Sequence, residues 1–315
     1  MSSAWFIAGA TATGKSAVAQ QLAEQLGCSI LSADSMLVYQ GMDIGTAKPS
    51  PAERGNVPYF GIDLVTPGQP FSTGLWLDAA RNALADTAPH DASAAQSLIV
   101  AGGTGLYIKA LTDGFDSDAA SPTERARWQA FYERGGIDAL QRALEARAPG
   151  ALDTLPDSAN PRRLIRALEL LDTRGSLPAQ WKRDATTAAP VTVLRMPREQ
   201  LHARIARRVA AMFASGLIDE VRTLRRDFPA WSDSASQAIG YAEVRALLDG
   251  TLTGREAAER ITIRTRQLAK RQETWFRHQT QAIWIDIEDT DPTERVAQRV
   301  LDTWRQHGAT PVISP

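Results

Sequence analysis

Cysteine is almost absent from this chain of 315 residues, in which Cys28 is the only one. A single thiol cannot form a disulfide within the chain, so a disulfide-based scaffold is excluded. The four histidines are scattered without metal-ligand spacing, and no zinc site is predicted.

The chain also lacks a long apolar run and a strong charge of either sign. No stretch approaches the roughly 20 residues of a membrane-spanning helix, and the short apolar stretch near the N-terminus is expected to be a strand, not a signal peptide. The formal net charge of −1 gives no global indication of nucleic-acid binding, so any basic surface must be local. With 43% hydrophobic residues the chain can bury a large core. A cytoplasmic monomer with no membrane partner is expected.

The most informative feature that is present lies at residues 9–16, Gly-Ala-Thr-Ala-Thr-Gly-Lys-Ser. This stretch fits the phosphate-binding pattern G-x-x-x-x-G-K-[ST], with an apolar run before it and helical spacing of apolar residues after it. The backbone N–H groups and the helix dipole at such a loop can surround a phosphate or diphosphate. Lys15 would add a positive charge at the outer oxygens, and the Ser16 hydroxyl would reach a bound Mg²⁺. The pattern alone does not say which diphosphate is bound.

Two further apolar runs end in polar or glycine-rich turns. Residues 28–31 are followed by Asp34 and Ser35, and residues 97–101 are followed by the turn Gly102-Gly103-Thr104-Gly105. In a parallel, doubly wound sheet such turns meet at the carboxyl ends of the strands, where ligands bind. We therefore expect an α/β fold, a P-loop nucleoside-triphosphatase-like parallel sheet flanked by helices.

The composition changes between about residues 117 and 189, where Ala- and Arg-rich helical segments follow one another without a strand signal. An inserted all-helical domain is therefore predicted at 117–189, with residues 1–116 and 190–315 forming the P-loop core. Within the core, residues 42–71 are expected to form long loops and the tail at 307–315 is expected to fray.

Asp34 should end the second strand a short distance across the sheet from the phosphate loop. A carboxylate there can accept a proton from a nucleophile that approaches the diphosphate. A helix cap, or Mg²⁺ binding through water, fits the same position about equally well. The turn at 102–105 offers N–H donors for a second diphosphate contact. Because the strand before it ends in glycine, where a motor-type nucleotidase has an Asp for Mg²⁺, an ATP-hydrolysing motor is disfavoured.

Basic residues gather in two places. The long helix predicted at about 254–279 carries six basic residues and one acid between 260 and 277, and a second cluster lies in the insertion at Arg162, Arg163 and Arg166. Such runs are often solvated surface, but two clusters with aromatic rings beside them also suit a phosphate backbone and its bases. The long helix is expected to dock on the core through residues at heptad spacing, Ile261, Leu268 and Trp275.

Together these motifs resemble the bacterial tRNA dimethylallyltransferases. The resemblance extends from about residue 5 to residue 285 and is carried, in the family's order, by residues 9–16, 34–39, 41–49, 102–107, 163–169, 240–241 and 266–277. It implies transfer of a dimethylallyl group from dimethylallyl diphosphate to N6 of the adenosine immediately 3′ of the anticodon, in tRNAs that read codons beginning with U. The products would be N6-isopentenyladenosine and diphosphate.

The resemblance also implies roles for individual residues. Asp34 would be the general base, with Thr104 and Lys15 assisting the reaction, and Ser16 would contact Mg²⁺. Diphosphate would be bound by the loop residues Gly9, Ala10, Thr11, Ala12, Thr13, Gly14, Lys15 and Ser16. The positions that match tRNA contacts are Asp34, Ser35, Met36, Leu37, Thr104, Arg125, Arg162, Arg163, Leu164, Ile165, Arg166, Gln237, Ala238, Ile239, Gly240, Tyr241, Ala242, Lys270, Arg271, Gln272, Glu273, Thr274, Trp275, Phe276 and Arg277.

The sequence departs from the family in a few places. Ala10 stands where proline is commoner, Ala159-Asn160 where Asn-Asp is usual, and Gln237 and Ala242 where basic residues are often found. Three alternatives remain: a small-molecule kinase of the shikimate-kinase type, an adenylate isopentenyltransferase, and a non-catalytic RNA-binding protein. The chain length, the insertion and the basic helix argue against the kinase, which needs none of them.

Overall fold

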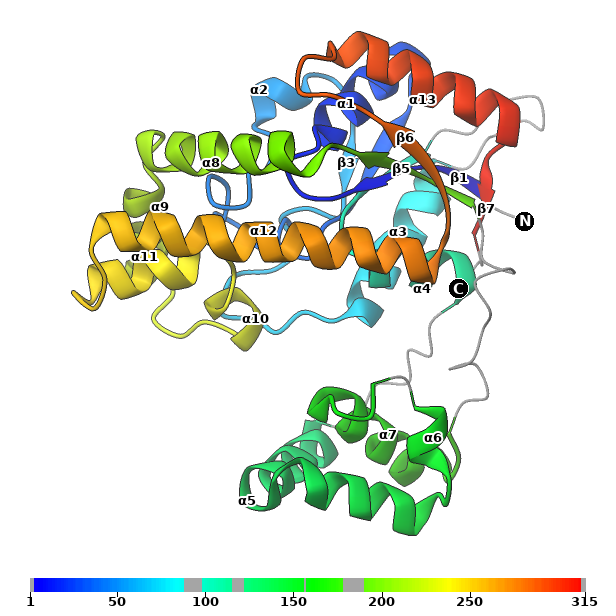
Figure 1. Ribbon diagram of the computed structural model, residues 1–315, viewed down its shortest axis with the longest axis vertical. Coiled ribbons are helices and arrows are strands. Elements are labelled where there is room, and N and C mark those ends of the chain that lie inside the picture. The colour runs from blue at the N-terminus through cyan, green and yellow to red at the C-terminus, as the bar shows by residue number, and fades with distance from the viewer. Residues whose placement is uncertain (1–2, 88–97, 115–121, 156, 178–189, 313–315) are drawn as a thin grey trace. The chain divides into compact units, whose positions relative to one another are not determined.

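The apolar runs of the sequence form one largely parallel sheet in the computed structural model, which describes residues 3–87, 98–114, 122–155, 157–177 and 190–312. Figure 1 shows the sheet and the helices around it. The strands are β1 (Ser3–Gly9), β2 (Ser29–Ala33), β3 (Tyr59–Phe60), β4 (Leu98–Gly102), β5 (Pro190–Arg195), β6 (Gln281–Asp286) and β7 (Thr310–Pro311). Their order across the sheet is β3-β2-β4-β1-β5-β6, and β7 pairs antiparallel with β1.

The carboxyl ends of the central strands lie level with one another. Gly102 of β4 is paired with Ala8 of β1 and with Ala33 of β2, and Gly9 of β1 is paired with Leu194 of β5. The segments that follow these four strands therefore leave the sheet at one edge, where ligands of open parallel sheets bind.

Helices cover the sheet. The chain divides into two compact units, and the sheet belongs to the first, residues 1–115 and 188–315. Its described helices are α1 (Lys15–Leu26), α2 (Pro51–Arg54), α3 (Thr73–Asp86), α4 (Gly105–Asp113), α8 (Arg198–Ala214), α9 (Leu217–Asp227), α10 (Asp233–Ser236), α11 (Tyr241–Leu248), α12 (Gly254–Gln279) and α13 (Thr293–His307). Helix α1 packs beside α13, and α3 packs beside α4 (Figure 1). The predicted P-loop-like parallel sheet flanked by helices is confirmed. Within the described ranges, no helix combines the length and the apolar composition that crossing a membrane requires.

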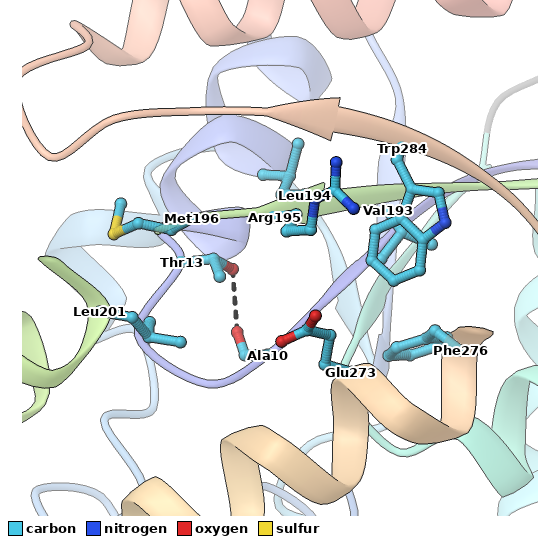
Figure 2. Close-up of a pocket in the computed structure, with 10 residues that line it drawn as sticks. All are labelled: Ala10, Thr13, Val193, Leu194, Arg195, Met196, Leu201, Glu273, Phe276 and Trp284. Atoms are coloured by element: carbon cyan, nitrogen blue, oxygen red, sulfur yellow. Dashed lines mark hydrogen bonds between the residues drawn. The ribbon is translucent and has the colours of Figure 1, made fainter. Parts of the chain in front are cut away.

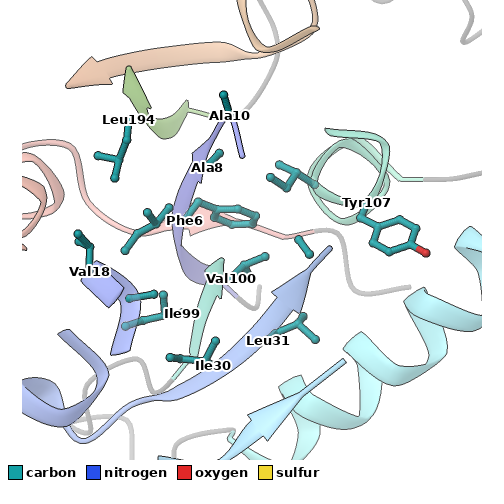
Figure 3. Close-up of a cluster of buried hydrophobic side chains, with 14 of the residues drawn as sticks. Phe6, Ala8, Ala10, Val18, Ile30, Leu31, Ile99, Val100, Tyr107 and Leu194 are labelled. Atoms are coloured by element: carbon teal, nitrogen blue, oxygen red, sulfur yellow. The ribbon is translucent and has the colours of Figure 1, made fainter. Parts of the chain in front are cut away.

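Buried side chains hold in place the strands whose carboxyl ends form this edge of the sheet. Phe6, Leu31 and Val100, from three neighbouring strands, are almost fully buried and pack in one cluster (Figure 3). Each such side chain contributes about 1.5–3 kcal/mol by leaving water. On α3, Trp76 stacks on Tyr107 of α4 and donates its indole N–H to the Ser32 carbonyl at 2.8 Å. This packing gives the loops at the carboxyl edge a rigid base.

Two segments are more ordered than the sequence predicts. The stretch 42–71 contains α2 and the short edge strand β3, which pairs with β2. In the tail, β7 pairs with β1, Thr310 donates its hydroxyl to the Pro190 carbonyl at 2.6 Å, and Val312 is buried, so fraying is wrong up to residue 312. Residues 313–315 lie outside the described part of the chain. Strands of two residues carry too little periodicity to be recognised.

The long basic helix docks through a different set of residues from the predicted one. Ile261 is buried as expected, but Leu268 and Trp275 are only half-buried, and the fully buried positions beside them are Ala269 and Phe276. A straight α-helix has 3.6 residues per turn, so its buried stripe drifts away from a strict heptad by about 20° per seven residues.

The second compact unit spans residues 116–187, and its described residues form helices with a core of their own. These helices are α5 (Pro122–Arg147), α6 (Ala151–Thr154) and α7 (Pro161–Arg174), and α5 is broken at Gly136, where φ is 66°. Asp172 accepts a hydrogen bond from the Trp128 indole at 2.6 Å and pairs with Arg147, which ties α7 to α5. The predicted insertion also includes residues 117–121, 156 and 178–189, which lie outside the described ranges.

Candidate active site

The glycine-rich loop joins β1 to α1 in the conformation that the sequence pattern requires. A side chain at Gly9 would place a Cβ 2.8 Å from the Leu194 carbonyl oxygen, and Gly14 has a left-handed φ of 88°. Ala12 also has a positive φ, 67°, which the pattern does not mark. The Thr13 hydroxyl donates to the Ala10 carbonyl at 2.9 Å and closes the turn. The loop therefore curves around a space in which an anion can accept hydrogen bonds from the backbone N–H groups.

Lys15 is the buried charge of this loop. Its ammonium group donates to the Ala10 carbonyl at 3.3 Å. Burial lowers the pKa of Lys15 to about 8; the Asp34 carboxylate opposes this shift, and the positive charge of Arg208 adds to it. A buried ammonium of this kind is stabilised when an anion binds beside it.

Asp34 and Thr104 are held against each other across neighbouring strands. The Ser35 N–H donates to the Thr104 hydroxyl at 2.9 Å, and the Thr104 N–H donates to the Ala33 carbonyl at 2.9 Å. Asp34 accepts the Met36 N–H on Oδ1 at 2.9 Å, while in the described part of the chain its Oδ2 has no hydrogen-bond partner. One carboxylate oxygen thus closes a turn; it caps no helix, because residues 35–38 form turns where the cap reading expects a helix. The other oxygen stays available for a proton, as the second reading requires.

Two arginines of α8 complete the site and were not predicted. Arg208 donates to the Thr11 hydroxyl at 3.4 Å and to the Thr46 carbonyl at 3.0 Å, and burial lowers its pKa. The guanidinium group of Arg204 lies 3.4 Å from the position of a Cβ on Gly14. Arg204 and Arg208 are four residues apart, so they share one helix face. The four-residue spacing of these arginines can be read from the sequence, but nothing in the sequence shows that this helix face lies against the phosphate loop.

Helix α12 is hydrogen-bonded to both glycine turns. The Gln272 amide accepts the Thr11 N–H at 2.8 Å and donates to the Gly103 carbonyl at 2.9 Å. A side chain at Gly103 would collide with this amide, and one at Gly105 would collide with the Trp275 ring. The turn at 102–105 therefore consists largely of glycine so that α12 can lie against it. This brings the predicted basic helix to the phosphate loop.

A small cavity lies behind the loop, on the side of β5 and α12 (Figure 2). Its walls include Leu194, Met196 and Phe276, and Ala10 and Thr13 contribute from the loop itself. Arg195 and Glu273 line it as well, so the wall is part apolar and part charged.

The residues predicted to contact tRNA divide into surface and core. Exposed or half-buried are Asp34, Ser35, Met36, Thr104, Arg125, Arg162, Arg163, Arg166, Gln237, Ile239, Ala242, Lys270, Arg271, Gln272, Glu273, Thr274, Trp275 and Arg277. Buried are Leu37, Leu164, Ile165, Ala238, Gly240, Tyr241 and Phe276. The side chains among these point into the interior of their unit; those of Leu164, Ile165, Tyr241 and Phe276 do so because one face of each helix docks on the core.

Tyr241 is the largest of these buried residues. Its ring lies against Gly45, its hydroxyl donates to Glu220 at 2.6 Å, and burial raises its pKa. Tyr241 therefore supports the loop at 42–48 from within.

Ser16 is the only loop position that fits a metal ligand. Its hydroxyl is exposed at the start of α1, and it has no partner in the described structure. Among the described residues, no group of three or more His, Cys, Asp or Glu side chains could hold a metal by itself. Mg²⁺ commonly combines one or two protein oxygens with phosphate oxygens of a substrate, and this donor set suits that arrangement.

Comparison with known proteins gives one family. The IPP transferase family model matches residues 37–279, and the isopentenyl transferase model matches residues 2–63. A tRNA dimethylallyltransferase of Anaeromyxobacter dehalogenans strain 2CP-C is 41% identical over 303 residues, 93% of this chain and 97% of that protein. The Bacillus subtilis strain 168 protein of the same name is 39% identical over 287 residues, 89% of this chain and 90% of the relative.

Solved structures agree. The full-length tRNA isopentenylpyrophosphate transferase of Bacillus halodurans has a TM-score of 0.67 and 33% identity, covering 98% of both chains. A eukaryotic dimethylallyltransferase captured acting on tRNA has a TM-score of 0.73 over 98% of this chain and 81% of its own; at 23% identity it supports the fold alone. This chain belongs to the IPP transferase family.

Proposed function

We propose that this protein transfers a dimethylallyl group from dimethylallyl diphosphate to N6 of the adenosine 3′-adjacent to the anticodon, in tRNAs that read codons beginning with U. The observation that carries the proposal is the meeting of Lys15, Arg208 and Asp34 at one sheet edge, where the charges of Asp34 and Arg208 both act on the pKa of Lys15. A buried ammonium group and a half-buried guanidinium group suit a diphosphate, and the carboxylate beside them suits a base. A cytoplasmic location, where tRNA is present, is part of this proposal.

In the proposed reaction the N6 nitrogen attacks C1 of the dimethylallyl group. The C1–O bond breaks as the N–C bond forms, diphosphate leaves with the bonding electron pair, and the amino proton passes to Oδ2 of Asp34. An adenine amino group is a weak nucleophile, so both general-base help and stabilisation of the leaving diphosphate are needed. Thr104 fixes Asp34 through the Ser35 N–H, and its hydroxyl lies at the same edge.

The loop N–H groups, Lys15, Arg204 and Arg208 would bind the diphosphate oxygens. When bound, Mg²⁺ would neutralise further charge on the leaving group, with Ser16 as its protein ligand. The basic side chains that remain exposed on α12, Lys270, Arg271 and Arg277, would contact the tRNA backbone, together with Arg125, Arg162 and Arg163 of the helical unit. Turning the adenine out of the anticodon loop costs a few kcal/mol, which backbone contacts would offset.

A direct assay separates this proposal from its alternatives. The protein is incubated with labelled dimethylallyl diphosphate, Mg²⁺ and either unmodified tRNA or AMP. We expect label in tRNA alone. Label in AMP would instead indicate an adenylate isopentenyltransferase, and phosphate transfer from ATP to a small acid would indicate a kinase.

A further inference from the structure

A second cavity, of about 720 Å³, lies beside the site just described and is lined by charged residues from α8, α12, β6 and α13. The basic side chains on its wall include Arg198, His202, Arg266 and Lys270. Lys15 and Ser16 do not line it, and it shares Arg195, Met196, Leu201 and Glu273 with the small cavity of Figure 2. It is therefore a separate space from the one where the loop would hold diphosphate.

Several cations of this cavity lack a counter-ion. The Nε of Arg266 is buried and has no hydrogen-bond partner in the described part of the chain. Arg198 and Lys270 make no hydrogen bond or ion pair with any described residue. Their neighbours differ: Arg195 binds Asp286 through two hydrogen bonds of 2.6 and 2.9 Å, and Arg295 lies 3.8 Å from Asp291.

The unpaired cations converge on one wall. Arg198, His202 and Arg266 line the same cavity; burial lowers the pKa of His202, and the positive charges of Arg266 and Arg198 lower it further. Four carboxylates, of Glu273, Asp286, Glu288 and Asp291, also line the cavity, against six arginine and lysine side chains, so the wall keeps an excess of positive charge. An anion in the cavity would offset this excess.

We propose that this cavity is a second anion-binding site, which takes the phosphate or diphosphate group of a small ligand through Arg198 and Arg266. Guanidinium and ammonium groups are the side chains that bind phosphate oxygens most strongly. The volume lies within the range of small-molecule sites. Glu288 also lines the cavity and makes no ion pair with a described residue, so the ligand carries hydrogen-bond donors as well.

The test uses the full-length protein, with inorganic diphosphate as the probe in isothermal titration calorimetry. Lys15→Met removes the buried ammonium group of the phosphate loop and leaves the second cavity intact. We expect this variant still to bind diphosphate at one site. Adding Arg266→Met or Arg198→Met should weaken that remaining site at least tenfold. Adding Arg207→Met should leave it unchanged, because Arg207 is exposed, lies outside the cavity and pairs with Asp289.

Two results would overturn the proposal. One is a Lys15→Met protein that binds no diphosphate, or whose binding is insensitive to both Arg266→Met and Arg198→Met. The other is a loss of tRNA affinity in the arginine variants with diphosphate binding unchanged, which would assign the cavity to an RNA phosphate. Because Arg198 is exposed at the start of α8, Arg198→Met keeps the test valid if Arg266→Met fails to fold.

Discussion

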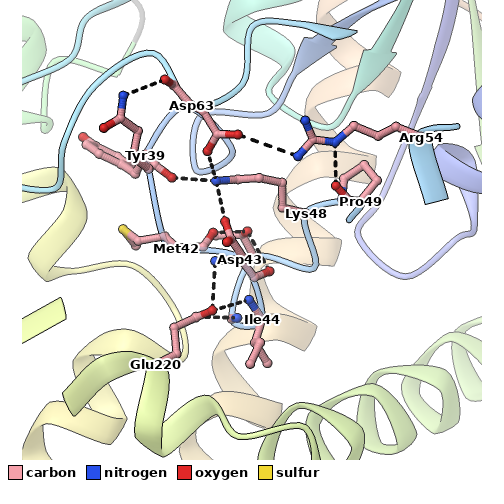
Figure 4. A network of polar contacts seen from close by, with 12 residues as sticks. Tyr39, Met42, Asp43, Ile44, Lys48, Pro49, Arg54, Asp63 and Glu220 are labelled. Carbon is pink, nitrogen blue, oxygen red and sulfur yellow. Dashed lines mark hydrogen bonds and ion pairs between the residues drawn. The ribbon is translucent and has the colours of Figure 1, made fainter. Parts of the chain in front are cut away.

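The carboxylate of Glu220, on α9, accepts the backbone N–H of Ile44 at 2.7 Å. It also accepts the N–H groups of Asp43 and Gly45, at 3.1 and 3.2 Å, and the Tyr241 hydroxyl. Figure 4 shows this carboxylate below the loop and the buried ammonium group of Lys48 above it. The next residue, Thr46, accepts Arg208 on its carbonyl. Glu220 therefore positions the loop that in turn orients an arginine of the candidate site.

Glu220→Gln should disturb this arrangement, because a neutral amide accepts backbone hydrogen bonds more weakly than a carboxylate does. We expect the KM for dimethylallyl diphosphate to rise about tenfold, since misplacing a binding group by a fraction of an ångström weakens it strongly. We also expect a loss of about 1–3 kcal/mol in the free energy of unfolding. Steady-state prenyl transfer and urea unfolding measure the two effects.

The control for this substitution is Asp219→Asn, one residue away. Asp219 is exposed and pairs with Arg222 only. It should change neither quantity. If Glu220→Gln behaves like the control in the KM measurement, Glu220 does not position the site.

Arg208→Met should weaken diphosphate binding much more than Arg207→Met. Arg208 lies against the phosphate loop, whereas the neighbouring Arg207 is exposed and pairs with Asp289. Charge-assisted hydrogen bonds of a partly buried guanidinium group contribute about 1.5–3 kcal/mol, which corresponds to a loss of roughly 10- to 100-fold in affinity. Calorimetry with inorganic diphosphate compares the two variants, and equal affinities would remove Arg208 from the site.

The residues that could be predicted are those whose chemistry follows from local pattern. Lys15, Asp34 and Thr104 each follow an apolar run, and parallel pairing of β1, β2 and β4 brings such positions to one edge. Arg208 and Glu220 lie on helices far along the chain, and only the packing of α8 and α9 brings them to the loop. The burial of Phe276 and Tyr241 could not be predicted either, because a motif in a sequence does not show which of its residues faces the core.

Asp34→Asn should lower the rate of prenyl transfer by about 10²–10⁴-fold, the usual contribution of a general base. The amide can still accept the Met36 N–H, so the turn after β2 should keep its conformation. Affinity for tRNA should therefore stay within several-fold of that of the unmodified protein. Single-turnover kinetics and filter binding measure the two, and a normal single-turnover rate would exclude Asp34 as the base.

Gly105→Ala should destabilise the protein because the new methyl group would collide with the Trp275 ring of α12. Overpacking of this kind costs about 1–3 kcal/mol. Gly254→Ala, at the start of the same helix, is the matched control, since a Cβ there meets no atom within 4 Å. Urea unfolding of the two variants tests whether α12 is held against the turn; equal stabilities would contradict this contact.

Lys15 makes the stability of the unliganded protein depend on pH. Its pKa falls from 10.5 in the unfolded chain to about 8 in the fold. Below pH 8 both states carry the proton, and the buried charge costs roughly 3 kcal/mol. Between pH 8 and 10.5 the unfolded chain binds more protons than the fold, so the contribution of Lys15 to stability rises with pH. The difference in unfolding free energy between Lys15→Met and the unmodified protein should shrink over that range, and a constant difference would contradict a depressed pKa.

Diphosphate binding should show the opposite trend with pH. A bound diphosphate stabilises the charged form of Lys15, so the pKa of the complex lies above about 8. Binding below pH 7 should therefore involve no net proton change at this lysine, whereas binding at pH 9 should take up close to one proton, and affinity should fall up to tenfold per pH unit above 8. Calorimetry in buffers of different ionisation enthalpy counts the protons. A complex that takes up no proton at pH 9 would mean that Lys15 does not contact the ligand in its charged form.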